Sequence, residues 1–84
     1  MHEGTICREI IDIVGHAANI NDIKNVYEIV LRVGPYSCIH NQQLNFYFDI
    51  MSKGTCMENA VIVIERDESI SGISQMYVKT FKGE

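Results

Sequence analysis

The sequence predicts an α+β fold, a two-layer sandwich in which two helices pack on a three-stranded sheet. Two segments repeat apolar residues at helical spacing, and three segments alternate or are continuously apolar, as strands are. These segments follow one another in the order helix, strand, helix, strand, strand, and two helices are enough to cover one face of such a sheet. Because a chain of 84 residues buries a single core, we expect residues 1–84 to form one domain.

The first helix is predicted over residues 5–19. Thr5 is suited to cap its start, and the polar stretch 19–22 is suited to end it. Gly15 weakens the helix by about 1 kcal/mol relative to alanine. The apolar residues recur at the spacing of one helical face, which is expected to lie against the core: Ile6, Ile10, Ile13, Val14 and Ala17.

A strand is predicted over residues 25–34, where the apolar period changes from that of a helix to two residues. Gly34 and Pro35 then break the strand. Alternate side chains form its apolar face: Tyr27, Ile29, Leu31 and Val33.

The second helix is predicted over residues 41–53. Lys53 places a cation in its last turn, and Gly54 follows where a left-handed cap is needed. The aromatic run 46–48 is interpreted as core rather than as a base-stacking platform, because nucleic acid would require nearby basic residues. The apolar residues again have helical spacing: Leu44, Tyr47, Phe48 and Met51.

Two further strands are predicted, over residues 60–66 and 76–82. The first is β-branched and almost wholly apolar, which is typical of a central strand that is buried on both faces. The second alternates apolar and polar residues and has a shorter apolar stretch. Residues 67–75 between them form a serine-rich loop, and we expect the two strands to pair antiparallel across it.

Composition excludes several classes of function. With 7 basic and 11 acidic residues the net charge is −4, which argues against a nucleic-acid or anionic-membrane surface. The apolar run 60–64 is far shorter than the roughly 20 residues that span a bilayer. The N-terminus lacks the apolar segment of a signal peptide. We therefore expect a cytoplasmic protein.

The three cysteines, Cys7, Cys38 and Cys56, are widely spaced. No Cys-x-x-Cys pair occurs, so they form neither a zinc ribbon nor a thioredoxin-type motif. We interpret them as reduced, partly buried thiols. The sequence contains no glycine-rich phosphate loop, and its spacing suggests no Ser/His/Asp arrangement. An enzyme is therefore not expected.

A candidate metal site lies at the N-terminus, in Met1-His2-Glu3. The α-amine of Met1, the backbone amide of His2 and its imidazole can close adjacent chelate rings on one metal ion. The amine titrates at about 7.7 to 8.0 and the imidazole at about 6.5, and nitrogen donors in one plane suit Ni(II) or Cu(II). The residues alone leave a second interpretation open, a start methionine followed by a solvated terminal histidine.

Taken together, these segments resemble the HypA/HybF family of hydrogenase nickel-incorporation proteins. The resemblance runs without gaps through about the first 66 residues, and Met76–Glu84 is similar to the family's closing strand. It rests on the order and spacing of short motifs: Met1–Glu3, Ile10–Val14, Leu31–Cys38, Leu44–Ile50, Lys53–Thr55 and Val63–Arg66.

The resemblance implies a nickel-binding domain whose ligands are His2 and the N-terminal backbone of Met1 to Glu3. It also implies a metallochaperone that hands Ni(II) to hydrogenase large-subunit precursors, and sometimes to urease, together with a HypB-like GTPase. Backbone amides bind metal only when deprotonated, so capture is expected to release protons and to weaken below neutral pH. The Glu3 carboxylate is then an outer ligand, a partner that orients the imidazole, a docking charge, or only a favourable acid at a helix start.

Two features depart from the family pattern. The family's nickel domain is interrupted before its last strand by a zinc domain with two Cys-x-x-Cys pairs, whereas this chain has only the loop 67–75 there. Structural zinc is therefore not expected. Near the start of the second helix, where family members often place Asp or Glu, this chain has His40. His40 is either a further nickel ligand or a solvated histidine at a helix start.

An alternative function is that of a shortened HypA paralogue that has lost metal delivery and acts as a protein-interaction or regulatory module. The exposed edge of the sheet would then serve as a pairing surface, for example in a homodimer. The Met1–Glu3 motif favours the chaperone, and the missing zinc domain favours the module. The sequence leaves this choice open.

Overall fold

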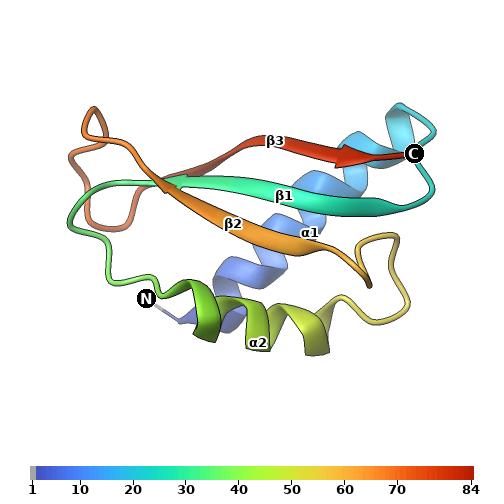
Figure 1. Cartoon of the computed structure of the whole chain (residues 1–84), viewed down its shortest axis with the longest axis horizontal. Coiled ribbons are helices and arrows are strands. Elements are labelled where there is room, and N and C mark those ends of the chain that lie inside the picture. Colours follow the sequence, from blue (N-terminus) through green and yellow to red (C-terminus); the bar gives the residue numbers. More distant parts are fainter. Residues whose placement is uncertain (1) are drawn as a thin grey trace.

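A computed structural model describes residues 2–84 and confirms the predicted order of elements. The ends of the helices and strands lie within two residues of the predicted ones. Neither helix of this described range is long and apolar enough to cross a membrane. The elements, drawn in Figure 1, are α1 (Glu3–Ile20), β1 (Val26–Val33), α2 (Asn41–Met51), β2 (Val61–Arg66) and β3 (Met76–Gly83).

β1 is the central strand of the sheet, whose order is β2-β1-β3. β2 runs parallel to β1, with Val33 opposite Arg66, and β3 runs antiparallel to β1. The prediction that the last two strands pair with each other is therefore wrong. The loop between them crosses the end of β1, where the Asp67 N–H donates to the Val33 carbonyl at 2.8 Å. Each of the two strands consequently has β1 as its neighbour.

The apolar sequence of β2 suggested a central strand, but β2 lies at an edge of the sheet. Val61 is 54% exposed, and Val63 is exposed as well, whereas Ile62 between them is buried. Asn45 of α2 covers the outer edge of β2. Its side-chain amide accepts the Ile62 N–H and donates to the Ile62 carbonyl, both at 2.9 Å. Part of the open strand edge is thus already occupied within the chain.

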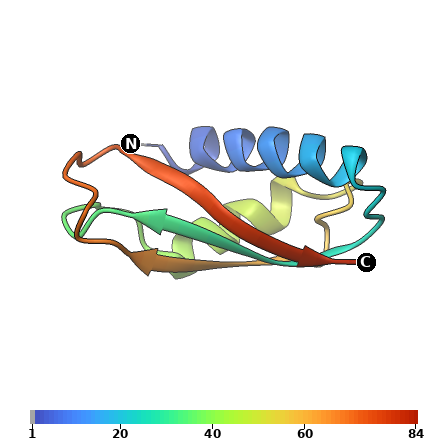
Figure 2. The ribbon, with the colours of Figure 1, turned by 90° about the horizontal axis from the view of Figure 1, so that it is seen from above.

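The core lies where α1 crosses one face of the sheet and α2 packs beside β2 and against α1 (Figures 1 and 2). The predicted apolar stripe of α1 is confirmed at Ile6, Ile10 and Val14, but Ile13 is 53% exposed. Burial continues through Ala18 along the i, i+4 row because α1 crosses the sheet obliquely. The other large core side chains come from the strands and α2: Val26, Ile29, Leu31, Val33, Leu44, Phe48 and Ile62.

Tyr27 does not belong to the apolar face of β1, although it has the same parity as Ile29. The register of β1 against β3 is irregular between Val26 and Glu28. Because of this irregularity Val26 is buried, and Tyr27 is turned to the surface, where its hydroxyl donates to the Glu84 carboxylate. The alternation of apolar and polar residues in the sequence does not reveal a local irregularity of this kind.

The aromatic run of α2 is core at only one of its three positions. Phe48 is buried, as predicted, whereas Phe46 is 62% exposed and Tyr47 is partly exposed. The Phe46 and Tyr47 rings pack edge to face on the surface, with centroids 5.6 Å apart. Successive residues of a helix point about 100° apart, so three neighbours cannot all face one core.

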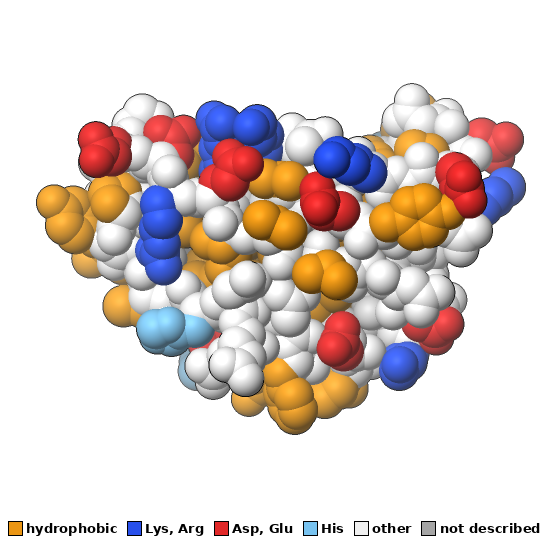
Figure 3. Space-filling view, in the orientation of Figure 1, with side chains coloured by type: hydrophobic (Ala, Val, Ile, Leu, Met, Phe, Trp, Pro, Cys, Tyr) orange, Lys and Arg blue, Asp and Glu red, His pale blue; other side chains and the backbone are white. Residues whose placement is uncertain are grey.

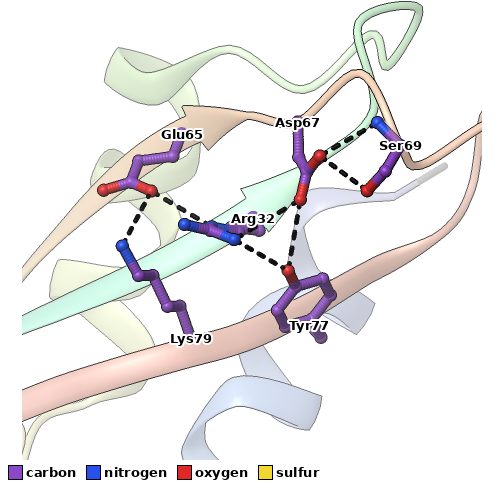
Figure 4. A network of polar contacts seen from close by, with 6 residues as sticks. All are labelled: Arg32, Glu65, Asp67, Ser69, Tyr77 and Lys79. Carbon is purple, nitrogen blue, oxygen red and sulfur yellow. Dashed lines mark hydrogen bonds and ion pairs between the residues drawn. The ribbon is translucent and has the colours of Figure 1, made fainter.

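The face of the sheet turned away from α1 carries charged side chains of both signs, interspersed over the surface in Figure 3. Arg32 of β1 lies at the centre of a polar network that joins the three strands (Figure 4). Its Nε donates to Glu65 of β2 at 3.2 Å, and its Nη1 donates to the Tyr77 hydroxyl of β3 at 3.2 Å. Lys79 approaches the same Glu65 carboxylate at 3.4 Å. The loop after β2 joins this network through Asp67.

Candidate metal centre

His2 is the N-cap residue of α1. Its backbone is extended (φ −89°, ψ 127°), and its carbonyl accepts the N–H groups of Thr5 and Ile6 at 3.1 and 3.2 Å. The imidazole is exposed and makes no hydrogen bond that caps the helix. The structure therefore leaves this predicted ligand side chain open to a metal ion at the start of α1. The other predicted terminal ligand, Met1, lies outside the described residues.

Glu3 opens the first turn of α1, where the helix dipole favours negative charge. It also lines a small cavity of about 90 Å³. The remaining lining residues come from two segments that are distant in the sequence: Ser37, Cys38 and Ile39 after β1, and Ile73 and Ser74 of the loop 67–75. Glu3 thus lies beside two connections that sequence analysis did not place near it.

Cys7, one turn after Glu3, is a structural thiol. It is buried, and its Sγ–H donates to the Leu44 carbonyl at 3.6 Å. Burial, and then the negative charge of Glu3, raise the pKa of the Cys7 thiol to about 11. Because Cys7 is enclosed in the core and bonded to Leu44, it is not among the ligands proposed for nickel. The interpretation of this cysteine as a buried thiol is confirmed, whereas Cys38 is exposed.

His40 is the N-cap residue of α2 and, like His2, is exposed with no capping bond from its side chain. It lines a shallow hollow on the outer side of α2 with Asn41, Gln42, Gln43, Phe46 and Tyr47. His2 and Glu3 are not among the residues that line this hollow. Within residues 2–84, no three His, Cys, Asp or Glu side chains are grouped so that they could hold a metal ion. His40 as a nickel ligand stays a prediction.

The segment 34–40 connects β1 to α2 and forms one wall of the cavity beside Glu3. It begins with a turn, in which the Ser37 N–H donates to the Gly34 carbonyl at 3.2 Å. The guanidinium of Arg66, at the end of β2, donates to carbonyl groups of this segment. Sequence analysis missed this role of Arg66. No sequence signal indicates it, because it depends on the parallel register that sets Arg66 beside Val33.

The loop 67–75 contributes Ile73 and Ser74 to the same cavity and is anchored at Asp67. The Asp67 carboxylate accepts the Ser69 hydroxyl and N–H at 2.7 and 2.9 Å, and Arg32 lies 3.4 Å away (Figure 4). The bonds from Ser69, with smaller contributions from Tyr77 and Arg32, hold the pKa of Asp67 below its usual value. The loop therefore starts from a fixed carboxylate on the network of the sheet.

Comparison with known proteins gives one consistent family. A family model described as hydrogenase/urease nickel incorporation, metallochaperone, HypA, matches residues 1–72. The hydrogenase maturation factor HypA of Actinobacillus succinogenes is 40% identical over 62 residues, which cover 74% of this chain and 55% of that protein. The factor of the same name from Legionella pneumophila is 34% identical over 64 residues, or 76% of this chain and 57% of that protein. The chain thus spans less than two thirds of the length of these relatives.

A solved structure has the same fold. The solution structure of the Ni metallochaperone HypA from Helicobacter pylori matches with a TM-score of 0.79, over 99% of this chain and 97% of that chain. The sequence identity is 13%, so this match speaks for the fold alone. It confirms the predicted arrangement of two helices and a three-stranded sheet, and the family model covers most of the sequence. The chain belongs to the HypA family of hydrogenase and urease nickel-incorporation metallochaperones.

Proposed function

We propose that this chain captures Ni(II) at the N-terminal Met1-His2-Glu3 motif and delivers it to a NiFe hydrogenase precursor, with urease as an alternative client. The observation that carries the proposal is an exposed His2 imidazole, unused by helix capping, at the N-terminus of a chain of the HypA family. The family description names a metallochaperone, in agreement with the prediction that the chain is not an enzyme.

The helix start supports the proposed set of backbone ligands. The first N–H groups of an α-helix have no partner within the helix, so removing the Glu3 amide proton breaks no helical hydrogen bond of α1. The ligands are then the Met1 amine, the His2 amide and imidazole, and the Glu3 amide. Nickel is the cargo of this site, and four nitrogen donors in one plane are a set that Ni(II) accepts. Loss of the amide protons makes capture stronger as the pH rises.

Release is easier from this site than from a buried one. The His2 side chain is exposed, and Glu3 lines a small cavity of about 90 Å³ instead of lying in the core. A partner can therefore reach the bound ion from solvent. We propose that the delivery partners are a HypB-like GTPase and the hydrogenase large-subunit precursor, and that the exchange takes place in the cytoplasm.

Structural zinc is not part of the proposed function. A structural zinc site requires four ligands in tetrahedral arrangement, usually cysteine and histidine. The residues present do not fit this requirement, because the Cys7 thiol donates to Leu44 and the described residues contain no group of three such ligands. The loop 67–75 would then take the place of the family's zinc domain.

The terminal chelate is tested by moving the amine while leaving every side chain in place. Protein with its native N-terminus and protein with one extra residue before Met1 are titrated with Ni(II), with Zn(II) and Cu(II) as competitors. We expect stoichiometric binding by the native form and its loss in the extended form. Equal, weak binding by both forms would contradict metal capture and favour a protein-interaction module.

The same titration decides whether His40 is a further ligand at the site. If His40 is a ligand, His40→Ala raises the Kd for Ni(II) and makes it less dependent on pH. His16→Ala is the matched control, because His16 is also exposed and lies on α1 far from the helix start. An unchanged Kd between about pH 6 and pH 8 would remove His40 from the site.

A further inference from the structure

We propose that Arg66 is a positioning residue of the nickel site, which fixes the segment 34–40 in the conformation that lines the cavity beside Glu3. This inference rests on the proposed function, because it concerns the same site. It assigns to Arg66 no contact with the metal. Arg66 acts through the backbone of a segment that shares a cavity with Glu3.

The guanidinium of Arg66 binds the segment near both of its ends. Nη1 donates to the Gly34 carbonyl at 3.1 Å and to the Ser37 carbonyl at 2.8 Å, and Nη2 donates to the Ile39 carbonyl at 3.0 Å. Gly34 follows the last residue of β1, and Ile39 precedes the N-cap of α2. One side chain therefore fixes the whole path of the chain between the central strand and the second helix.

This arrangement requires the shape of arginine as well as its charge. Three carbonyl oxygens converge on one planar group, and a guanidinium offers five N–H donors in a rigid fork. A lysine ammonium is a compact charge on a flexible stem and does not reproduce that geometry. Without the guanidinium, the carbonyls of Ser37 and Ile39 lose a charge-assisted hydrogen bond, which is about twice as strong as a neutral one.

The segment 34–40, which Arg66 holds, lies beside Glu3. Ser37, Cys38 and Ile39 line the cavity of about 90 Å³ together with Glu3. The Ser37 hydroxyl accepts the Ile39 N–H at 3.3 Å, and Ile39 itself is buried. The segment is consequently held in place by its Arg66 bonds, and it shares the cavity with Glu3. A shift of this segment changes the surroundings of the residue whose amide is a proposed ligand.

Metal sites are sensitive to such surroundings. Changes to residues that orient the ligands, without touching the ion, typically reduce metal affinity by about 10- to 100-fold. We expect Arg66→Gln to raise the Kd for Ni(II) by about 10-fold, at a temperature at which circular dichroism shows the variant folded. Arg66→Lys keeps the charge but lacks the fork, and should raise the Kd to a similar extent.

Cys38 provides a second readout that does not depend on nickel. Its thiol is exposed on the segment that Arg66 holds, whereas Cys7 is buried and Cys56 is partly buried. In a Cys56→Ser background, alkylation reports mainly on Cys38. We expect faster alkylation in Arg66→Gln, because the segment is released. Arg8→Gln is the matched control, since it removes the same charge from an exposed position on the helix that carries the motif.

The outcomes separate this inference from the proposed function. A weaker Kd and faster Cys38 alkylation in both Arg66 variants, with Arg8→Gln unchanged, support it. If wild type binds Ni(II) through its terminus and Arg66→Gln binds equally well, the role of Arg66 is refuted while the proposed function stands. Recovery of the wild-type Kd in Arg66→Lys, or an equal loss of affinity in Arg8→Gln, would show that only the positive charge matters. Either result would also refute the proposed role of Arg66. If native and N-terminally extended proteins bind alike, the proposed function fails and this inference with it.

Discussion

At the residue scale, the first turns of α1 bring a carboxyl side chain, Glu3, close to a buried thiol, Cys7. Glu3 lies in the first turn, where the dipole of the helix favours its carboxylate. Cys7, one turn later, is buried, and the nearby Glu3 charge further opposes formation of its thiolate. The Cys7 thiol is therefore not among the ligands that we propose for nickel. The nitrogen donors of Met1-His2-Glu3 are left as the ligands for the proposed capture of nickel.

The free energy of unfolding should depend on pH through the ionisation of Cys7. Its pKa is raised from 9.0 to about 11 in the folded protein, so between these values the folded chain retains a proton that the unfolded chain releases. The contribution of Cys7 to stability is thus fully present below pH 9 and is lost as the pH rises through about 11. In urea unfolding, wild type should lose more free energy of unfolding across this interval than Cys7→Ala does. Equal losses in the two proteins would contradict the assignment.

Single residues also show which parts of the candidate site can be predicted from the sequence. The donors around His2 are neighbours along the chain, so their chelate can be proposed from the sequence. Cys38 comes beside Glu3, and Arg66 binds the segment that carries Cys38, only through the fold. No local pattern connects either residue with Glu3, and the sequence could not predict that connection.

At the scale of single elements, periodicity located the helices and strands but not all of their buried faces. Apolar spacing defined α2 correctly, yet it could not decide which of three successive aromatic residues enters the core. Similarly, the continuous apolar run of β2 is typical of a parallel strand, and β2 is parallel to β1. Its place at the edge depends on α2, whose Asn45 binds the Ile62 backbone from outside. That contact links elements that are separate in the sequence.

The two phenylalanines of α2 should respond differently to truncation. Phe48 is fully buried, so Phe48→Ala should lower the free energy of unfolding by about 3–5 kcal/mol. Phe46 is mostly exposed and packs only edge to face on Tyr47. Phe46→Ala should therefore cost no more than about 1 kcal/mol, the order of one aromatic pair. Urea unfolding of the two variants provides the measurement, and losses of similar size would show that the aromatic run is core throughout.

At the scale of the whole molecule, the order β2-β1-β3 determines what lies near the N-terminal motif. Since β2 and β3 flank β1, the loop 67–75 must cross the end of β1, and it passes close to Gly34 on its way. The crossing brings Ile73 and Ser74 to the cavity beside Glu3 and buries Ile70. Sequence analysis described this segment only as a serine-rich loop, and the strand order shows that it packs on the rest of the fold.

This crossing predicts that Gly34 cannot carry a side chain. A Cβ atom at Gly34 would lie 2.6 Å from the Ile70 carbonyl oxygen, closer than such atoms approach, and 3.4 Å from that of Gly72. The obstacle is lack of space, because Gly34 does not have a positive φ. Gly34→Ala should lower the free energy of unfolding by about 1–3 kcal/mol, the usual cost of overpacking.

Gly4→Ala is the control for that variant, because nothing lies within 4 Å of the corresponding Cβ position in α1. Alanine is preferred over glycine in helices by up to about 1 kcal/mol, so this variant should be at least as stable as wild type. Urea unfolding compares the three proteins. If Gly34→Ala is as stable as wild type, the loop 67–75 can move away from β1 without loss. The loop would then not be a fixed wall of the cavity, and only the segment held by Arg66 would confine the space beside Glu3.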